Sequence, residues 1–67
     1  MTLHDAFRLF SRLGIDVPHL TRAEFAAAYI ALAKRYHPNG GTFADEELMK
    51  NINAARTTIL RSFQTEK

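Results

Sequence analysis

One run of residues constrains this chain more than any other, the segment 36–41 with the sequence Tyr-His-Pro-Asn-Gly-Gly. It lies between two stretches that have the periodicity of amphipathic helices. Pro38 disfavours the α conformation for the residue before it, so a helix that reaches Tyr36 should end there. The Asn-Gly-Gly that follows tolerates positive φ and favours a turn. The run therefore predicts a loop at the tip of a helical hairpin.

Three threonines mark where helices should begin. Each precedes an acidic residue by three positions, in the pairs Thr2 and Asp5, Thr21 and Glu24, and Thr42 and Asp45. A threonine oxygen that caps the first turn, followed by an acid three places on, is the capping-box pattern. The acid also interacts favourably with the positive end of the helix dipole. The three pairs predict three helices.

Apolar residues recur with a helical period after each of these caps. The stripes are Leu3, Phe7 and Phe10, then Phe25, Tyr29, Leu32 and Tyr36, then Leu48, Ile52, Ala55 and Ile59. We expect helices over about residues 3–13, 22–36 and 43–63, with Gly14 and Ile15 closing the first in a Schellman motif. Because no segment alternates with period two, the fold class should be all-α.

The chain length and the loop lengths predict how the helices are arranged. With 67 residues, the chain should form a single domain, 1–67. The loop between the second and third helices is short, and a short loop between long helices gives antiparallel neighbours. We therefore expect an antiparallel helical hairpin with the shorter first helix packed across it.

The composition argues against several classes of site. The chain has no cysteine, so it can form neither a disulfide nor a thiolate metal site. Its histidines, His4, His19 and His37, include no pair at i, i+4 spacing, so we expect no metal site and no cofactor. Ser11 and Ser62 are isolated on expected helices, so no catalytic triad can be assembled and we expect no enzyme activity.

Charge and hydropathy bear on location and partners. The formal net charge of +2 permits an acidic partner without requiring nucleic acid. Acidic residues 45–47 begin the third helix, where they would repel phosphates, so a small nucleic-acid binder is the least favoured function and we expect no nucleic-acid partner. The chain lacks both a signal-peptide pattern and a run of ~18 apolar residues, so we expect no membrane span and a cytoplasmic location.

Residues on both sides of the loop have the spacing of a known family. They are Tyr29, Leu32, Ala33, Tyr36, His37 and Pro38 before the turn, and Met49, Ile52, Asn53 and Ala55 after it. This pattern resembles the J-domain of the DnaJ co-chaperone family, and Leu13-Gly14-Ile15 resembles the end of that family's first helix. The resemblance spans about residues 3–60 and implies the J-domain fold.

The resemblance also implies a partner and a binding site. In the family, the loop reads His-Pro-Asp, docks on a DnaK-type heat-shock ATPase and triggers nucleotide hydrolysis, while a basic face on the second helix steers the encounter. Carried over to this chain, the loop is His37, Pro38 and Asn39, and the basic residues that remain are Arg22, Lys34 and Arg35. The chain would then be a co-chaperone or a regulator of such an ATPase.

Two departures from the family pattern qualify that function. Asn39 replaces the family's Asp, so the loop loses its charge and activation of the ATPase should be weakened or lost. The outward positions of the second helix are apolar, which leaves Ala27, Ile30 and Ala31 as a seat for a helix. The alternative function is therefore a helix-pairing adaptor that binds another J protein or a partner helix through this face, as some J-like domains without the loop Asp pair with a J protein. The cognate chaperone, the client and the oligomeric state stay open.

The dipeptide Asn39-Gly40 has a chemical property of its own. Asn-Gly in a loop is prone to deamidation, which gives aspartate or isoaspartate. The aspartate product would restore the loop sequence of the family.

Overall fold

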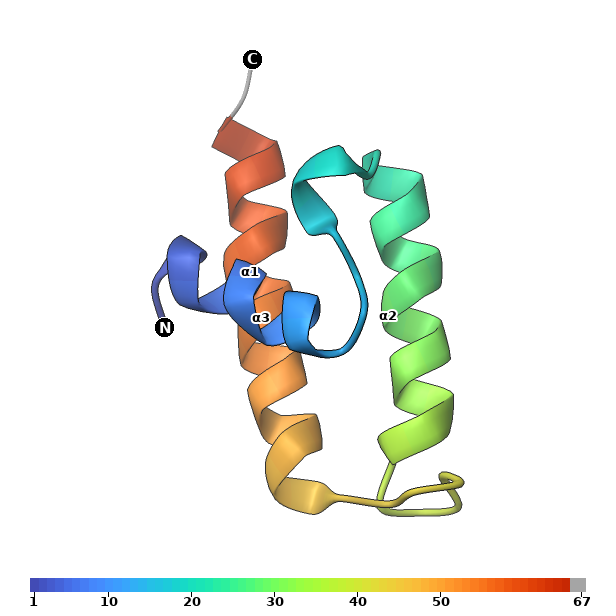
Figure 1. Ribbon diagram of the computed structural model, residues 1–67. Helices are drawn as coiled ribbons and strands as arrows, with labels where there is room; N and C mark the ends of the chain where they lie inside the picture. Colours follow the sequence, from blue (N-terminus) through green and yellow to red (C-terminus); the bar gives the residue numbers. More distant parts are fainter. Residues whose placement is uncertain (66–67) are drawn as a thin grey trace.

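The computed structural model describes residues 1–65, and all its regular elements are helical, with no strand in that range. The elements are α1 (Leu3–Arg12), the 3₁₀ turn η1 (Val17–His19), α2 (Arg22–Tyr36) and α3 (Glu46–Thr65). Figure 1 shows α2 and α3 running antiparallel, joined at one end by the loop 37–45, with α1 packed across the pair. The predicted all-α hairpin with a short first helix across it is confirmed.

Two of the three predicted caps begin helices as expected. The Oγ1 of Thr2 accepts from the backbone N–H of Asp5 at 3.1 Å. Thr21 and Glu24 form a reciprocal capping box. The N–H of Glu24 donates to Oγ1 of Thr21 at 3.1 Å, and the N–H of Thr21 donates to Oε1 of Glu24 at 2.8 Å. Because these bonds satisfy N–H groups that a helix start leaves unpaired, they fix where α1 and α2 begin.

The third predicted start is wrong. The helix α3 begins at Glu46, three residues later than expected, and the side chain of Asp45 caps it by accepting from the N–H of Leu48 at 3.0 Å. Thr42 and Phe43 lie in the loop instead. The helix also continues two residues past its expected end. In the predicted pair of Thr42 and Asp45, the N-cap of α3 is therefore Asp45 and not Thr42.

The end of α1 matches the predicted Schellman motif. Gly14 has a φ of 84°, and its N–H donates to the carbonyl of Ser11 at 3.0 Å. The N–H of Ile15 donates to the carbonyl of Phe10 at 2.9 Å. These two bonds satisfy helix-end carbonyls and turn the chain sharply. The helix ends at Arg12, one residue earlier than expected.

The core is assembled from all of these elements. Its buried members are Ala6, Phe10, Val17, Phe25, Leu32, Met49, Ile52, Ala55 and Ile59. Phe25 of α2 joins the three helices. Its ring lies edge-on to the ring of Phe10 in α1, with a centroid distance of 5.3 Å, and the centroid of the Phe63 ring in α3 lies 6.2 Å away. Edge-to-face aromatic pairs add to the free energy gained by burial. Val17, which lies between the first two helices in the sequence, is carried into this core by η1.

A polar link joins α2 to α3 outside the core. The hydroxyl of Tyr29 donates to Oδ1 of Asn53 at 2.6 Å. The guanidinium of Arg56 lies 4.8 Å from the centre of the Tyr29 ring, within the range of a cation–π interaction. Asn53 is therefore a structural hydrogen-bond partner between helices. This link stabilises the side-by-side packing of the two long helices.

We predict that Ile52→Ala destabilises the protein far more than Ile30→Ala. Ile52 is fully buried, whereas Ile30 is 52% exposed. Losing a buried isoleucine side chain costs about 2–5 kcal/mol, while an exposed substitution stays within about 0.5 kcal/mol. The free energy of unfolding, from urea titration followed by circular dichroism, measures both. Equal losses for the two variants would contradict the packing described above.

Candidate functional site

The loop 37–45 is bonded back onto the end of α2. The N–H of Phe43 donates to the carbonyl of Arg35 at 2.7 Å, and the N–H of Asp45 donates to the carbonyl of Tyr36 at 3.0 Å. The N–H of Gly41 donates to the carbonyl of His37 at 2.9 Å. Carbonyls at a helix end have no partner within the helix, so the loop supplies the partners that α2 needs. The loop is therefore held in one conformation by backbone hydrogen bonds.

Two glycines make this conformation possible, for different reasons. Gly40 has a φ of 111°, which residues with a side chain rarely adopt. At Gly41 the reason is close approach, because a Cβ would lie 2.6 Å from the nitrogen of His37 and 2.7 Å from the carbonyl oxygen of Arg35. Any side chain at position 41 would push the loop off the helix end.

The apex of the loop presents Pro38 and Asn39 to solvent. Both residues are exposed, as is His37. The imidazole of His37 turns toward the loop, since its Nδ1 accepts from the backbone N–H of Asn39 at 3.1 Å. That bond requires a neutral ring with its proton on Nε2. The His-Pro-Asn tripeptide is thus an ordered and accessible surface.

Two basic side chains lie beside the apex. Lys34 lines a shallow recess together with His37 and Asn39. The guanidinium of Arg35 lies 5.6 Å from the ring centre of Tyr36 and 5.1 Å from that of Phe43, within cation–π range of both. Phe43, which the sequence pattern did not indicate as a site residue, is 59% exposed and belongs to the loop. Its one signal was that it falls outside the apolar stripe of the third helix.

The structure brings together most of the predicted partner-binding residues. Lys34, Arg35 and the tripeptide 37–39 share the end of α2 that faces the loop. Arg22 is the first residue of α2, so it lies about 18 Å from Lys34 along the helix axis. A partner that covers the apex would reach Arg22 only if it also extended along the whole of α2.

The predicted helix-pairing face is also accessible. Ala27, Ile30 and Ala31 are all exposed on α2. A second recess is lined by Ala31, the two basic residues, Thr42 and Phe43, so this apolar strip continues to the loop. The strip and the apex are therefore adjacent parts of one surface.

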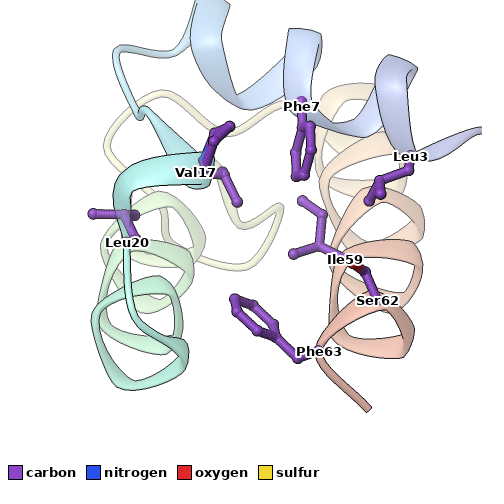
Figure 2. Close-up of a pocket in the computed structure, with 8 residues that line it drawn as sticks. Leu3, Phe7, Val17, Leu20, Ile59, Ser62 and Phe63 are labelled. Carbon is purple, nitrogen blue, oxygen red and sulfur yellow. The ribbon is translucent and has the colours of Figure 1, made fainter. Parts of the chain in front are cut away.

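A recess that the sequence pattern did not predict lies at the other end of α3 from the loop. Its volume is about 380 Å³, and it opens between α1, η1 and the last turns of α3. Figure 2 shows aromatic and aliphatic side chains pointing into it, among them Phe7, Val17, Ile59 and Phe63. Ser62 is the one polar side chain among the lining residues of the described chain. Such a lining offers apolar surface without an acid or a base.

The described residues offer neither a metal site nor a membrane span. Within residues 1–65, no three His, Asp or Glu side chains gather as a metal ion would require. None of the helices there has the length and apolar character that crossing a bilayer demands. Comparisons with protein families, with curated proteins and with solved structures find no match.

We predict that Gly41→Ala disrupts the loop, whereas Gly14→Ala does not. The added methyl group at position 41 would meet three backbone atoms below 3 Å, while at position 14 it would meet nothing within 4 Å. Gly14→Ala should cost about 1–2 kcal/mol for its positive φ. Gly41→Ala should cost about 3 kcal/mol, because three loop hydrogen bonds of about 1 kcal/mol each are lost.

Amide hydrogen exchange at Phe43 and Asp45 locates the effect. Protection of these amides should fall in Gly41→Ala and stay unchanged in Gly14→Ala at equal temperature. Unchanged protection in Gly41→Ala would show that the loop does not need its close approach to α2.

Proposed function

We propose that this chain is a J-domain-like co-chaperone, or a regulator of one, that docks on a DnaK-type heat-shock ATPase through residues 37–39. The observation that carries the proposal is the exposed, hydrogen-bonded His-Pro-Asn apex at the tip of an antiparallel hairpin. In this function the chain itself is no enzyme, since the hydrolysis belongs to the partner. We propose a cytoplasmic setting, with which the absence of cysteine is compatible.

The rigidity of the loop supports a docking role. A surface that is ordered before it binds loses less conformational entropy on binding than a disordered one. Backbone bonds to Arg35 and Tyr36 hold the loop, and His37 holds the backbone of Asn39. Lys34 and Arg35 add positive charge beside the apex. A rigid apex with basic flanks suits an acidic surface on the partner.

The amide of Asn39 should make the docked complex a weak activator. A hydrogen bond that involves a charged group contributes roughly 1.5–3 kcal/mol, against about 1 kcal/mol for a neutral one. A partner cation left buried without its counter-charge costs ~2–5 kcal/mol. A deficit of about 2 kcal/mol corresponds to about thirtyfold in an equilibrium constant. The proposed chain therefore keeps the shape of the docking loop and lacks the charge that would complete the contact.

We predict that the wild-type chain barely stimulates ATP hydrolysis by the DnaK-type ATPase of its own organism, and that Asn39→Asp raises the stimulation. The substitution supplies the missing carboxylate on an unchanged loop, so half-maximal stimulation should need about thirtyfold less protein. Single-turnover hydrolysis of ATP at increasing concentrations of the chain measures the effect.

The matched control is Asn51→Asp, which makes the same change of charge at an exposed position on α3. It should leave hydrolysis unchanged. If the two aspartate variants and the wild type behave alike, direct docking through the loop is wrong.

We also propose an alternative function, a helix-pairing adaptor for another J protein. The observation that favours it is the apolar strip formed by Ala27, Ile30 and Ala31, which continues to the exposed ring of Phe43. Exposed apolar surface that continues over several side chains is typical of interaction sites. The same apolar positions reduce the positive field of α2, so charge would steer a chaperone to this helix only weakly.

For this alternative, we predict that Ile30→Glu abolishes binding of the J-protein partner and leaves the fold intact. The new carboxylate would be buried at the interface without a counter-charge, whereas in the free chain it is solvated. Ala54→Glu, at an exposed position on α3, is the control and should bind normally. Titration calorimetry measures binding, and circular dichroism reports folding. Undiminished affinity in a folded Ile30→Glu variant would exclude this face.

A further inference from the structure

The amide side chain of Asn39 and the backbone nitrogen of Gly40 are both unengaged. In the described part of the chain, neither group makes a hydrogen bond. The residues on each side are held, because the N–H of Asn39 binds the His37 ring and the N–H of Gly41 binds the His37 carbonyl. The intervening peptide N–H is therefore free in an otherwise ordered loop.

The surroundings of Gly40 leave that nitrogen open to its neighbour. Gly40 has no side chain, and the space where a Cβ would point contains no atom within 4 Å. Asn39 is exposed, so water reaches its side chain. These are the conditions under which a backbone nitrogen can approach the carbonyl carbon of the preceding asparagine side chain.

The other asparagines of the chain lack these conditions. Asn51 and Asn53 lie inside α3, where each following backbone N–H donates to the carbonyl four residues earlier. The side chain of Asn53 is also engaged, since it accepts from the hydroxyl of Tyr29. Asn51 precedes Ile52, whose branched side chain is fully buried. The chain thus contains one open asparagine and two protected ones.

We propose that Asn39 is a site of spontaneous deamidation in the folded protein, and that the conversion switches the charge of the docking loop. The nitrogen of Gly40 attacks Cγ of Asn39 and a new N–Cγ bond forms. The Cγ–Nδ2 bond then breaks, and the side-chain nitrogen leaves as ammonia with the proton that the Gly40 nitrogen gives up. Water then opens the five-membered imide at either carbonyl, which gives aspartate or isoaspartate. No oxidant, reductant or enzyme is needed.

The regulatory part of this inference rests on the proposed function. Conversion places a carboxylate at the apex, next to Lys34 in the shared recess. If the loop docks as proposed, the aspartate form supplies the charge that the amide lacks, and stimulation of the ATPase rises as the protein ages. Newly made and aged chains would then differ in activity without any change of sequence in the gene.

The first measurement follows the modification alone. The folded protein is incubated at neutral pH and 37 °C for a time on the order of days, because uncatalysed covalent steps are slow. It is then cleaved with trypsin. Peptide 36–50 contains Asn39 as its one asparagine, and peptide 51–56 contains the two protected ones. We expect the mass gain that marks replacement of an amide by a carboxyl group in the first peptide and none in the second.

Two variants and one comparison sharpen the measurement. The peptide from Asn39→Asp marks where the aspartate product elutes. Asn39→Gln should stay unmodified, because a glutamine side chain closes an imide ring more slowly than an asparagine side chain does. A sample held in urea shows the reaction of the unfolded chain. No gain in the folded sample while the urea sample gains would overturn the proposal, and so would equal gains in both peptides.

Single-turnover hydrolysis with fresh and aged protein tests the regulatory part. We expect stimulation to increase in proportion to the fraction of aspartate form, up to the level of Asn39→Asp. If Asn39→Asp stimulates hydrolysis but the stimulation by aged protein does not rise with its fraction of aspartate form, the proposed switch is wrong. If Asn39→Asp itself fails to stimulate, the proposed function is wrong, whereas the mass of peptide 36–50 still decides the modification.

Discussion

The structure depends on the hydrogen bonds by which the loop 37–45 completes the end of α2. A helix leaves its last carbonyls unpaired, and here the N–H groups of Phe43 and Asp45 pair with two of them. The same bonds set where α3 can begin, because Asp45 must end the loop before it caps the next helix. The antiparallel placement of the long helices, and with it the core around Phe25, follows from this connection.

This construction separates the shape of the apex from its charge. The backbone around Asn39 is fixed by His37 and by two glycines, and none of these bonds involves the Asn39 side chain. Exchange between an amide and a carboxylate there changes the electrostatics of the surface with little effect on its geometry. For a loop that docks on a partner, affinity can therefore be altered by one group of atoms while the binding surface stays formed.

The surface beside the apex combines two kinds of character. Lys34 and Arg35 are basic, and the strip from Ala27 to Ala31 is apolar and continues to Phe43. The stacking of Arg35 on Phe43 orders both side chains at the junction. Interfaces often use aromatic residues and arginine as anchors. The proposed docking on an ATPase and the alternative pairing with a helix draw on adjacent parts of this one surface.

The sequence by itself determined the features that local bonds decide. It gave the correct limits of α2, the caps at Thr2 and Thr21 and the Schellman end at Gly14, because each depends on residues within a few positions of one another. Periodicity likewise identified the buried faces of α2 and α3, whereas Leu3 of the first predicted stripe is exposed. Tertiary structure alone decided the rest: the late start of α3, the need for glycine at position 41, the burial of Val17 and the link from Tyr29 to Asn53. Each of these arises where segments distant in sequence meet. The unpaired carbonyls at the end of α2 bind backbone N–H groups of the loop, and such bonds do not depend on residue type, so the sequence does not indicate them.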